Sequence, residues 1–417
     1  MGRRSKLSSV SSIHRPRINP LVQAVRHNPI REMTKRLENA RGDPEIISFG
    51  GGQPSLPPPK FALDRASDYL KQIRVHRYTS TPGLPEVRDA IAKMMVREEV
   101  WSNIDANNIL LTQSGSNGIE VAVSALAREG DEALVITPTY TGYLGTLQTH
   151  GVKINSVRRL PEENFRIDFD RLNEKIRKGK SRFIIVCTPD NPTGRILASG
   201  EIKTIGDLAQ DNGLAIISDE SYYRITYEED FRSFRDYLPN LIGVRSFSKT
   251  ASATGWRIGY NYADKELLDA MEKVNQFRML CVAPFFQELV YEFVQAHEER
   301  EEYLHHVVSV YKERRDAMAE SLKKQIPEAK FHTPQGAFYH FIQLPGIQDD
   351  TSFSEDLYNT VKVAIVPGSA FGMGADEGFF RLTFVSEEPP TIDEGVGRIA
   401  KYFEEHEETP RLFGSDY

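Results

Sequence analysis

Short apolar runs alternate with helical patterns through the middle of the chain. One of the helical patterns is GIEVAVSALARE, at residues 118–129. The apolar runs are ILLTQ (109–113), ALVIT (133–137), VKINSV (152–157), FIIVC (183–187), LAIIS (214–218) and LIGVRSF (241–247). Strands without a polar face belong in a sheet that helices cover on both sides. The pattern therefore predicts an α/β fold with a mostly parallel sheet between two helical layers.

The pattern changes after residue 263. Residues 264–326 read as helical and charged, and we expect their EERE and KERRD segments to face solvent. A final helix is expected near residues 391–405. Before it come three strand-like runs, HTPQGAFYHFIQL (332–344), VAIVPGSAFG (363–372) and FFRLTFV (379–385). These elements predict a second, smaller α+β domain.

Three regions follow from these patterns. We expect residues 60–290 to form the large domain and residues 291–417 to form the small domain with a long linking helix. Residues 1–59 should form an N-terminal arm and a segment that packs with the small domain, because the pattern of the large domain begins only near residue 60.

Composition narrows the function classes. The 417 residues carry a net charge of −7, and 27% of them are charged and 40% hydrophobic, which is typical of a globular protein of about two domains. No basic stretch is interleaved with aromatic residues, so we expect no nucleic-acid partner. The apolar runs are of strand length, so we expect no membrane span. The two cysteines have no metal-ligand spacing, and no metal site is expected.

The first 31 residues differ in composition from the rest. They contain no Asp or Glu, seven Lys or Arg and five Ser. An acid-poor, Arg- and Ser-rich start is typical of an organellar targeting segment, but a flexible arm has the same composition. We expect the arm and a cytoplasmic protein, with an organelle as the alternative.

Polar residues follow the predicted strands, where ligands bind in open α/β sheets. The turn Ser114-Gly115-Ser116 opens a helix after ILLTQ, and free backbone N–H groups there suit a phosphate. The other residues at strand ends are Tyr140, Asn191, Asp219, Tyr222, Lys249 and Arg257. Taken singly, each is equally compatible with a helix cap, a turn or core packing.

Lys249 gives this set a chemical meaning. It lies in SFSKTASATGW among small and hydroxyl side chains, as a desolvated lysine would. Such a lysine loses its proton more easily, and the neutral amine can condense with an aldehyde. Pyridoxal 5′-phosphate also needs a carboxylate for its ring nitrogen, donors for its ring oxygen, an aromatic neighbour and a phosphate site. This single ligand accounts for every strand-end residue.

A family resemblance agrees with this interpretation. From about residue 30 to 405 the chain resembles the fold type I, pyridoxal-phosphate-dependent aminotransferases of the aspartate/aromatic superfamily (class I/II). The segments that carry the resemblance are RYTSTPGLPEVRDAI, DNPTG, SDESYY, SFSKTASATGWRIGY, PQGAFY and FFRL.

The resemblance implies a role for each residue at the cofactor. Lys249 would bind the cofactor aldehyde and later carry the substrate proton, and Asp219 would pair with the pyridine nitrogen. Asn191 and Tyr222 would bond to the ring oxygen, and Tyr140 would stack on the ring. The phosphate would be held by Ser114, Gly115, Ser116, Ser246 and Arg257.

The resemblance also implies substrate and subunit contacts. Arg381 resembles the arginine that grips the substrate α-carboxylate, and Gly52, with Asn191, would line the substrate side. Tyr78 resembles a tyrosine that reaches the phosphate of a neighbouring subunit, which implies a homodimer with shared sites. The implied reaction is a ping-pong transfer of an amino group from an L-amino acid to a 2-oxo acid, with 2-oxoglutarate as the expected acceptor.

Several substrates stay open. The aspartate-preferring bacterial branch has a basic residue after the phosphate-loop glycine, where this chain has Ser116. The stretch NPIREMTKRLENARGDPEIISFGGGQP resembles the 2-aminoadipate/kynurenine branch, which makes Arg31 a candidate for binding a distal carboxylate. Aspartate, aromatic amino acids and 2-aminoadipate are the candidate donors. A C–S lyase on the same fold is the alternative reaction.

Overall fold

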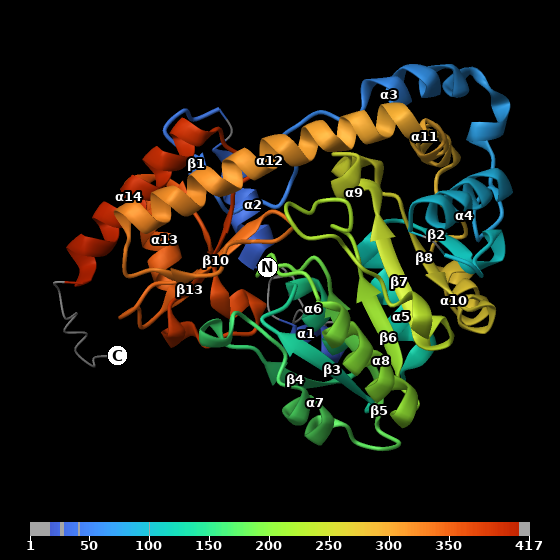
Figure 1. Ribbon diagram of the computed structural model, residues 1–417, viewed down its shortest axis with the longest axis horizontal. Helices are drawn as coiled ribbons and strands as arrows, with labels where there is room; N and C mark the ends of the chain where they lie inside the picture. Colours follow the sequence, from blue (N-terminus) through green and yellow to red (C-terminus); the bar gives the residue numbers. More distant parts are fainter. Residues whose placement is uncertain (1–16, 26–28, 41, 100, 408–417) are drawn as a thin grey trace, which may run out of the picture.

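The computed structural model describes residues 17–25, 29–40, 42–99 and 101–407 (Figure 1). Its largest sheet has seven strands in the order β2-β8-β7-β6-β5-β3-β4, and all but β8 run parallel. The strands are β2 (Ile109–Thr112), β3 (Glu132–Thr137), β4 (Lys153–Arg158), β5 (Ser181–Cys187), β6 (Ala215–Asp219), β7 (Leu241–Ser246) and β8 (Gly259–Ala263). The predicted α/β fold with a mostly parallel sheet is confirmed.

Helices cover both faces of this sheet because successive side chains along a strand point to opposite faces. Leu134 and Ile184 pack in one apolar core, while the next residues, Val135 and Ile185, pack in a second. The first core includes residues of α4 (Pro85–Glu99), α8 (Ser199–Asn212) and α11 (Pro284–Gln295), and the second includes residues of α5 (Gly115–Leu126), α6 (Thr141–Thr149) and α10 (Lys265–Arg278). Two cores on two faces explain the continuous apolar runs.

The antiparallel strand β8 has no counterpart among the predicted strands. Its sequence, GYNYA, alternates aromatic and polar residues and gives no continuous apolar run. The polar residues are nevertheless buried, since Asn261 is fully inaccessible and the Tyr262 hydroxyl donates a 2.7 Å hydrogen bond to Glu220. A pattern that counts only apolar residues does not detect a strand whose buried positions include polar residues.

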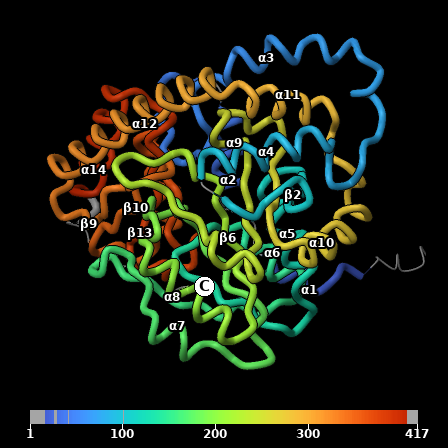
Figure 2. Tube along the Cα trace, turned by 45° about the vertical axis from the view of Figure 1, so that its right-hand side comes forward, coloured from blue at the N-terminus to red at the C-terminus, as the bar shows by residue number. Residues whose placement is uncertain are grey.

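A second sheet lies in the C-terminal part of the chain. Its four antiparallel strands have the order β12-β13-β10-β9, with bounds β9 (Lys330–Phe331), β10 (Tyr339–Gln343), β12 (Val366–Pro367) and β13 (Phe379–Thr383). Three helices lie near this sheet, namely α12 (His297–Gln325), α13 (Asp350–Val361) and α14 (Pro389–Glu407). Figures 1 and 2 show α12 beside α14 and extending across the molecule toward α11.

The N-terminal segment joins the C-terminal part. Helices α1 (Pro20–Ala24) and α2 (Pro29–Asn39) precede β1 (Ile47–Ser48), which pairs in parallel with β11 (Val363–Ala364). The backbone N–H of Thr383 donates a 2.8 Å hydrogen bond to the Phe49 carbonyl. Residues 47–49 are therefore held among strands that lie more than 300 positions later. Helix α3 (Lys60–Ala66) then begins the part of the chain that packs on the large sheet.

Two expectations from the pattern were wrong in detail. VAIVPGSAFG does not form one strand, because β11 pairs with β1 while β12 pairs with β13 in a different sheet. The EERE and KERRD segments of α12 do not simply face solvent, because Arg300, Arg314 and Arg315 are buried. Each of these arginines pairs with a glutamate from another part of the chain, for example Arg315 with Glu228 at 2.6 Å.

Within the described residues, no helix combines the length and the apolar character that crossing a lipid bilayer requires. The alternatives of an arm and a targeting segment concern the first 31 residues, of which residues 1–16 and 26–28 lie outside the described part of the chain.

Candidate active site

A cavity of about 630 Å³ lies beyond the carboxyl ends of the large sheet's strands. Residues of the large sheet, the small sheet and the N-terminal segment all line it. The structure brings together here every residue singled out from the sequence except Tyr78. These residues are Gly52, Ser114, Gly115, Ser116, Tyr140, Asn191, Asp219, Tyr222, Ser246, Lys249, Arg257 and Arg381. Arg31, on α2, also lines the cavity.

The turn between β2 and α5 forms one end of the cavity. Ser114 has φ 99°, a conformation that side-chain-bearing residues rarely adopt, and α5 begins at the next residue. A Cβ atom on Gly115 would lie 3.2 Å from the Ser221 hydroxyl, so a larger residue would crowd this end. Unsatisfied N–H groups and the positive end of a 12-residue helix favour an anion.

Two further groups lie at the same end. The Ser246 hydroxyl accepts a 3.2 Å hydrogen bond from the Ser248 N–H at the start of the short helix α9 (Phe247–Thr250). Arg257 has φ 51°, and its guanidinium donates a 2.9 Å hydrogen bond to the Thr254 carbonyl. Together, the helix start, the hydroxyl groups and the guanidinium form a cluster of donors suited to a phosphate.

Asp219 lies at the end of β6 and is buried. One carboxylate oxygen accepts a 2.6 Å hydrogen bond from the Tyr143 hydroxyl, and the other accepts a 3.0 Å bond from the Ser221 N–H. Burial raises the pKa of Asp219, while these hydrogen bonds and the charge of Lys249 oppose the rise. The carboxylate is therefore fixed by neutral donors and not by a cation.

The adjacent residue, Glu220, shows what a structural carboxylate looks like here. It is buried as well, but it forms an ion pair with Arg245 at 2.8 Å and accepts a hydrogen bond from Tyr262. Among the described residues, Asp219 has no ion-pair partner. A buried carboxylate without a cation is costly unless a cation in the cavity completes the pair.

Lys249 lies on α9, and its side chain reaches across the cavity. Its Nζ atom donates a 2.5 Å hydrogen bond to the Gly52 carbonyl. Burial and the guanidinium groups of Arg381 and Arg257 lower the pKa of Lys249 to about 8, against the opposing charge of Asp219. With such a pKa, about one amine in ten is neutral and nucleophilic at pH 7.

Arg381 lies on β13, on the opposite side of the cavity, and is buried. It donates a 3.1 Å hydrogen bond to the Asn191 side-chain oxygen and another to the Gly50 carbonyl. Its guanidinium carbon lies 4.2 Å from the centroid of the Tyr339 ring. Its Nε atom has no hydrogen-bond partner in the described chain, and burial lowers the pKa of Arg381. A guanidinium without a carboxylate is a receptor for an anionic ligand.

Among the cavity-lining residues that were not singled out from the sequence, three contact or adjoin the predicted site residues most directly. Tyr143 holds Asp219, Ser221 bounds the phosphate end, and Tyr339 lies against Arg381. Tyr143 could have been found from its spacing, because it follows Tyr140 by three residues at a helix start. Tyr339 ends the segment PQGAFY, which the resemblance already included.

Tyr78 lies outside the cavity of its own chain. Its side chain is 84% exposed, between the short helix η2 (Ile73–His76) and α4. No described residue of this chain explains such exposure of an aromatic ring. The cross-subunit contact implied by the resemblance stays a prediction.

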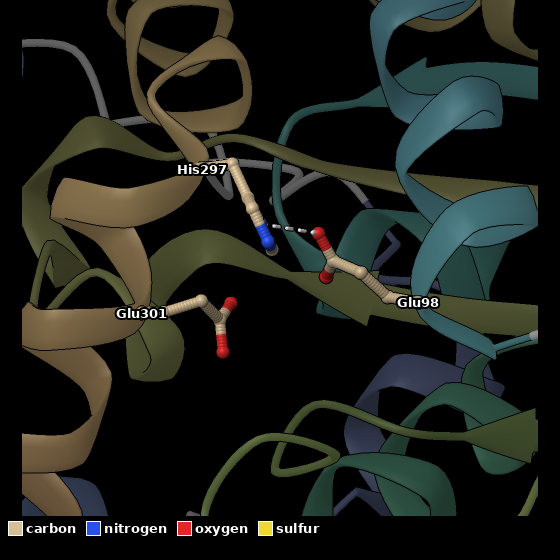
Figure 3. Close-up of side chains that lie close together, drawn as sticks. All are labelled: Glu98, His297 and Glu301. Atoms are coloured by element: carbon tan, nitrogen blue, oxygen red, sulfur yellow. Dashed lines mark ion pairs between the residues drawn. The ribbon is translucent and has the colours of Figure 1, made fainter.

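A group of side chains with metal-binding chemistry lies elsewhere, where α4 meets α12. Ligand atoms of Glu98, His297 and Glu301 lie within 4.8 Å of one another (Figure 3). Arg300 and Arg224, however, already pair with the same glutamates, with a distance of 3.1 Å between Arg224 and Glu98. Because two arginines balance the carboxylates, this group is an ion-pair network that links α4 to α12.

Comparison with known proteins shows the family of the chain and agrees with its fold. Residues 44–399 match the family described as aminotransferase class I and II. The chain is 32% identical over 387 residues to an aspartate aminotransferase of Pyrococcus horikoshii, covering 92% of this chain and 96% of that protein. It is 29% identical over 394 residues to a probable aspartate/prephenate aminotransferase of Aquifex aeolicus, covering 92% and 98%.

Solved structures show the same similarity. Aspartate aminotransferase from Thermus thermophilus with maleate superposes with a TM-score of 0.87 at 26% identity, covering 93% of this chain and all of that one. A Thermotoga maritima aspartate aminotransferase gives a TM-score of 0.85 at 27% identity, covering 93% and 100%. The chain belongs to the class I and II aminotransferases.

Proposed function

We propose that this protein transfers an amino group from an L-amino acid to a 2-oxo acid, with pyridoxal phosphate bound at Lys249. The observation that carries the proposal is the pairing of Lys249, whose pKa is lowered to about 8, with the buried and uncompensated Asp219 in one cavity. Relatives at about 30% identity over most of the chain are named aspartate aminotransferases. An ordinary core would contain neither residue in this state.

The residues present fit the cofactor. The start of α5, Ser246 and Arg257 would hold the phosphate, and Asp219 would pair with the ring nitrogen. Tyr140 would cover one face of the ring, while Asn191 and Tyr222 would bond to its oxygen. Pyridoxal phosphate supplies an aldehyde that takes up an amine and a pyridine ring that accepts an electron pair from the substrate.

The chain's own residues then divide the remaining work. The Arg381 guanidinium would bind the substrate carboxylate by two parallel hydrogen bonds and so orient the α-carbon. The Lys249 amine would take the proton from that carbon and hold it on Nζ until it is returned. A lysine with a pKa near neutrality can both accept and release this proton.

We propose aspartate or an aromatic amino acid as the donor and 2-oxoglutarate as the expected acceptor. The relatives' names support these donors, and one of the similar structures contains maleate, a dicarboxylate. Arg31 lines the same cavity as Arg381, and its charge contributes to lowering the pKa of Lys249. We therefore assign Arg31 to the second carboxylate of a dicarboxylic substrate, which Ser116 cannot bind by charge.

The proposal includes a homodimer, in which Tyr78 of one subunit would reach the phosphate in the other. The high exposure of Tyr78 in a single chain supports this role. We also propose the cytoplasm as the compartment, on the expectation that the N-terminal residues form an arm.

A labelling experiment tests the proposal. Protein supplied with pyridoxal phosphate should turn yellow, and borohydride should leave a pyridoxyl group on the peptide that contains Lys249. The Lys249→Ala variant should carry no label on this peptide. Mass spectrometry that finds the label on another lysine in both proteins would remove Lys249 from its role.

A product assay then separates the aminotransferase from a C–S lyase. A transaminase converts the cofactor to its amine form with each suitable donor and needs a 2-oxo acid to continue. A lyase releases pyruvate and ammonia without any acceptor, and that result would replace the proposed reaction while keeping the cofactor.

A further inference from the structure

Tyr339 lies between Arg381, the proposed substrate-binding residue, and Tyr222, the proposed partner of the cofactor's ring oxygen. Its ring lies against the Arg381 guanidinium at 4.2 Å, and its hydroxyl lies 2.8 Å from the Tyr222 hydroxyl. Both tyrosines are buried and line the cavity. We propose that Tyr339 is a positioning residue that fixes the substrate-binding arginine with its ring and directs the Tyr222 proton toward the cofactor with its hydroxyl. This inference rests on the proposed function.

The ring accounts for the first half of the role. Arg381 donates to Asn191 and to the Gly50 carbonyl, and its Nε atom has no hydrogen-bond partner among the described residues. Tyr339 lies on one side of the guanidinium, and Phe371 lies 4.9 Å away. Aromatic faces attract a desolvated guanidinium without using its hydrogen-bond donors. The donors therefore stay available for a carboxylate in the cavity.

The hydroxyl accounts for the second half. Two hydroxyl groups in contact share one hydrogen bond, and one of them keeps a free proton. Burial raises the pKa of both tyrosines, and the charge of Arg381 opposes the rise in each. We assign Tyr339 as the donor to Tyr222, because the Arg381 guanidinium lies 4.2 Å from the Tyr339 ring and its positive charge makes that hydroxyl the better donor. The Tyr222 proton is then free to be donated into the cavity, toward the ring oxygen of the cofactor.

Gly52 shows that the structure reserves space for this hydroxyl. A Cβ atom at position 52 would overlap the Tyr339 hydroxyl oxygen, whereas it would lie 3.4 Å or more from the nearest ring carbons. The backbone of Gly52 does not have a positive φ, so local conformation does not require glycine here. The residue's small size is therefore matched to Tyr339, and the same Gly52 carbonyl accepts the hydrogen bond from Lys249.

Two substitutions separate the two halves. Tyr339→Phe keeps the ring and removes the hydroxyl, and Tyr339→Leu removes both. With Tyr339→Phe, the pH midpoint of the bound cofactor's visible absorbance should rise by roughly one unit, because Tyr222 loses the donor that orients it. The KM values for amino acid and oxo acid should change less than about twofold, since the contact with Arg381 remains.

Tyr339→Leu should show the same shift of the midpoint and, in addition, raise both KM values roughly tenfold. The matched control is Tyr237→Phe, which removes a hydroxyl that donates to Asp207 far from the cavity and should change neither quantity. If the Phe and Leu variants had the same KM values, the ring would have no role. If the pH midpoint were unchanged in both variants, the hydroxyl would have no role.

Gly52→Ala tests the packing directly. In the wild-type background the added methyl group must displace the Tyr339 hydroxyl, and we expect the KM values to rise roughly tenfold. In the Tyr339→Phe background the overlap is gone, and the same substitution should raise them less than about threefold. Equal effects in the two backgrounds would contradict the proposed contact.

One measurement keeps this inference separate from the proposed function. Calorimetry of 2-oxoglutarate binding to cofactor-free protein reports carboxylate binding at Arg381 and Arg31 without any reaction, and Tyr339→Leu should weaken this binding roughly tenfold while Tyr339→Phe should not. Equal affinity of the wild type and Tyr339→Leu overturns the role of the ring. A wild-type protein that takes no pyridoxyl label at Lys249 overturns the proposed function instead.

Discussion

The two sides of the cavity are built on different principles. On the side of the large sheet, Asp219 and Ser246 come from the last residues of β6 and β7, and Lys249 follows three residues later. On the other side, Arg381 lies within a strand of the small sheet, and Gly52 comes from the N-terminal segment. The first side is a run of neighbouring strand ends, and the second is assembled from distant parts of the chain.

The charges differ in the same way. On the large-sheet side, Asp219 is held by two neutral donors that fix its direction. On the small-sheet side, the partners of Arg381 among the described residues are neutral acceptors and aromatic rings. A rigid carboxylate suits a group that stays bound, whereas an arginine with available donors suits a molecule that enters and leaves. The difference supports the proposal that the cofactor binds on the large-sheet side and the substrate on the small-sheet side.

The largest expected effect comes from the cofactor side. Asp219→Asn should keep the cofactor bound, because the phosphate and ring contacts remain, but should lower kcat roughly 10³-fold through the loss of the charge that holds the ring nitrogen. Absorbance spectra and single-turnover kinetics measure the two properties separately. Turnover close to that of the wild type would show that the carboxylate charge is not needed.

The substrate side should respond differently. Arg381→Ala should raise the KM values for amino acid and oxo acid together, by roughly 10²-fold, because both would use the same carboxylate contact. Arg381→Lys keeps a charge but cannot form the two-pronged bond, so it should recover only part of the loss. An increase for only one of the two substrates would argue against a shared site.

Lys249 connects the two sides, and its burial should cost stability in cofactor-free protein. Its pKa of about 8 lies below the unfolded value of 10.5, so between pH 8 and 10.5 the unfolded chain binds more protons and stability rises with pH. Lys249→Met should therefore be more stable than wild type at pH 7, by about 1–2 kcal/mol, with a smaller difference at pH 10.

Urea unfolding at the two pH values measures this difference. The control is Lys273→Met, which replaces an exposed lysine on α10 and should not change stability in this way. A gap between wild type and Lys249→Met that is constant with pH would mean that the titration of Lys249 does not contribute.

The smallest effect concerns substrate choice. Arg31→Ala should raise the KM for aspartate severalfold, about 3–10-fold, and leave aromatic donors unchanged, because only a dicarboxylate has a second charge to bind. Arg36→Ala, on the same helix but paired with Glu355 at 2.8 Å, is the matched control. If the KM values of all donors rose equally, Arg31 would act by holding α2 in place and not by binding the substrate.

Most strands and cavity-lining residues of the large-sheet side could be predicted from the sequence. The parallel strands that end at the cavity were recognised as short apolar runs, and most ligand-facing residues come soon after these runs. Their positions in the sequence therefore predict that they lie close together at one edge of the sheet. The role of Tyr143 was not predicted, because it depends on a hydrogen bond to Asp219, 76 positions later. The burial of the arginines on α12 was not predicted, because a charged helix face has the same sequence pattern whether it contacts water or a glutamate from another segment.

The sequence by itself determined the α/β fold and the residues at the strand ends, because periodicity and local spacing are encoded within a few neighbouring positions. It also predicted a reactive lysine. Tertiary structure alone decided that Gly52, Tyr339 and Arg381 meet Lys249, that β11 and β12 separate into different sheets, and that Asp219 lacks the cation that Glu220 has. These facts depend on contacts between residues far apart in the chain. Burial and neighbouring charges shift the pKa values of such residues only when the fold brings the residues into one cavity.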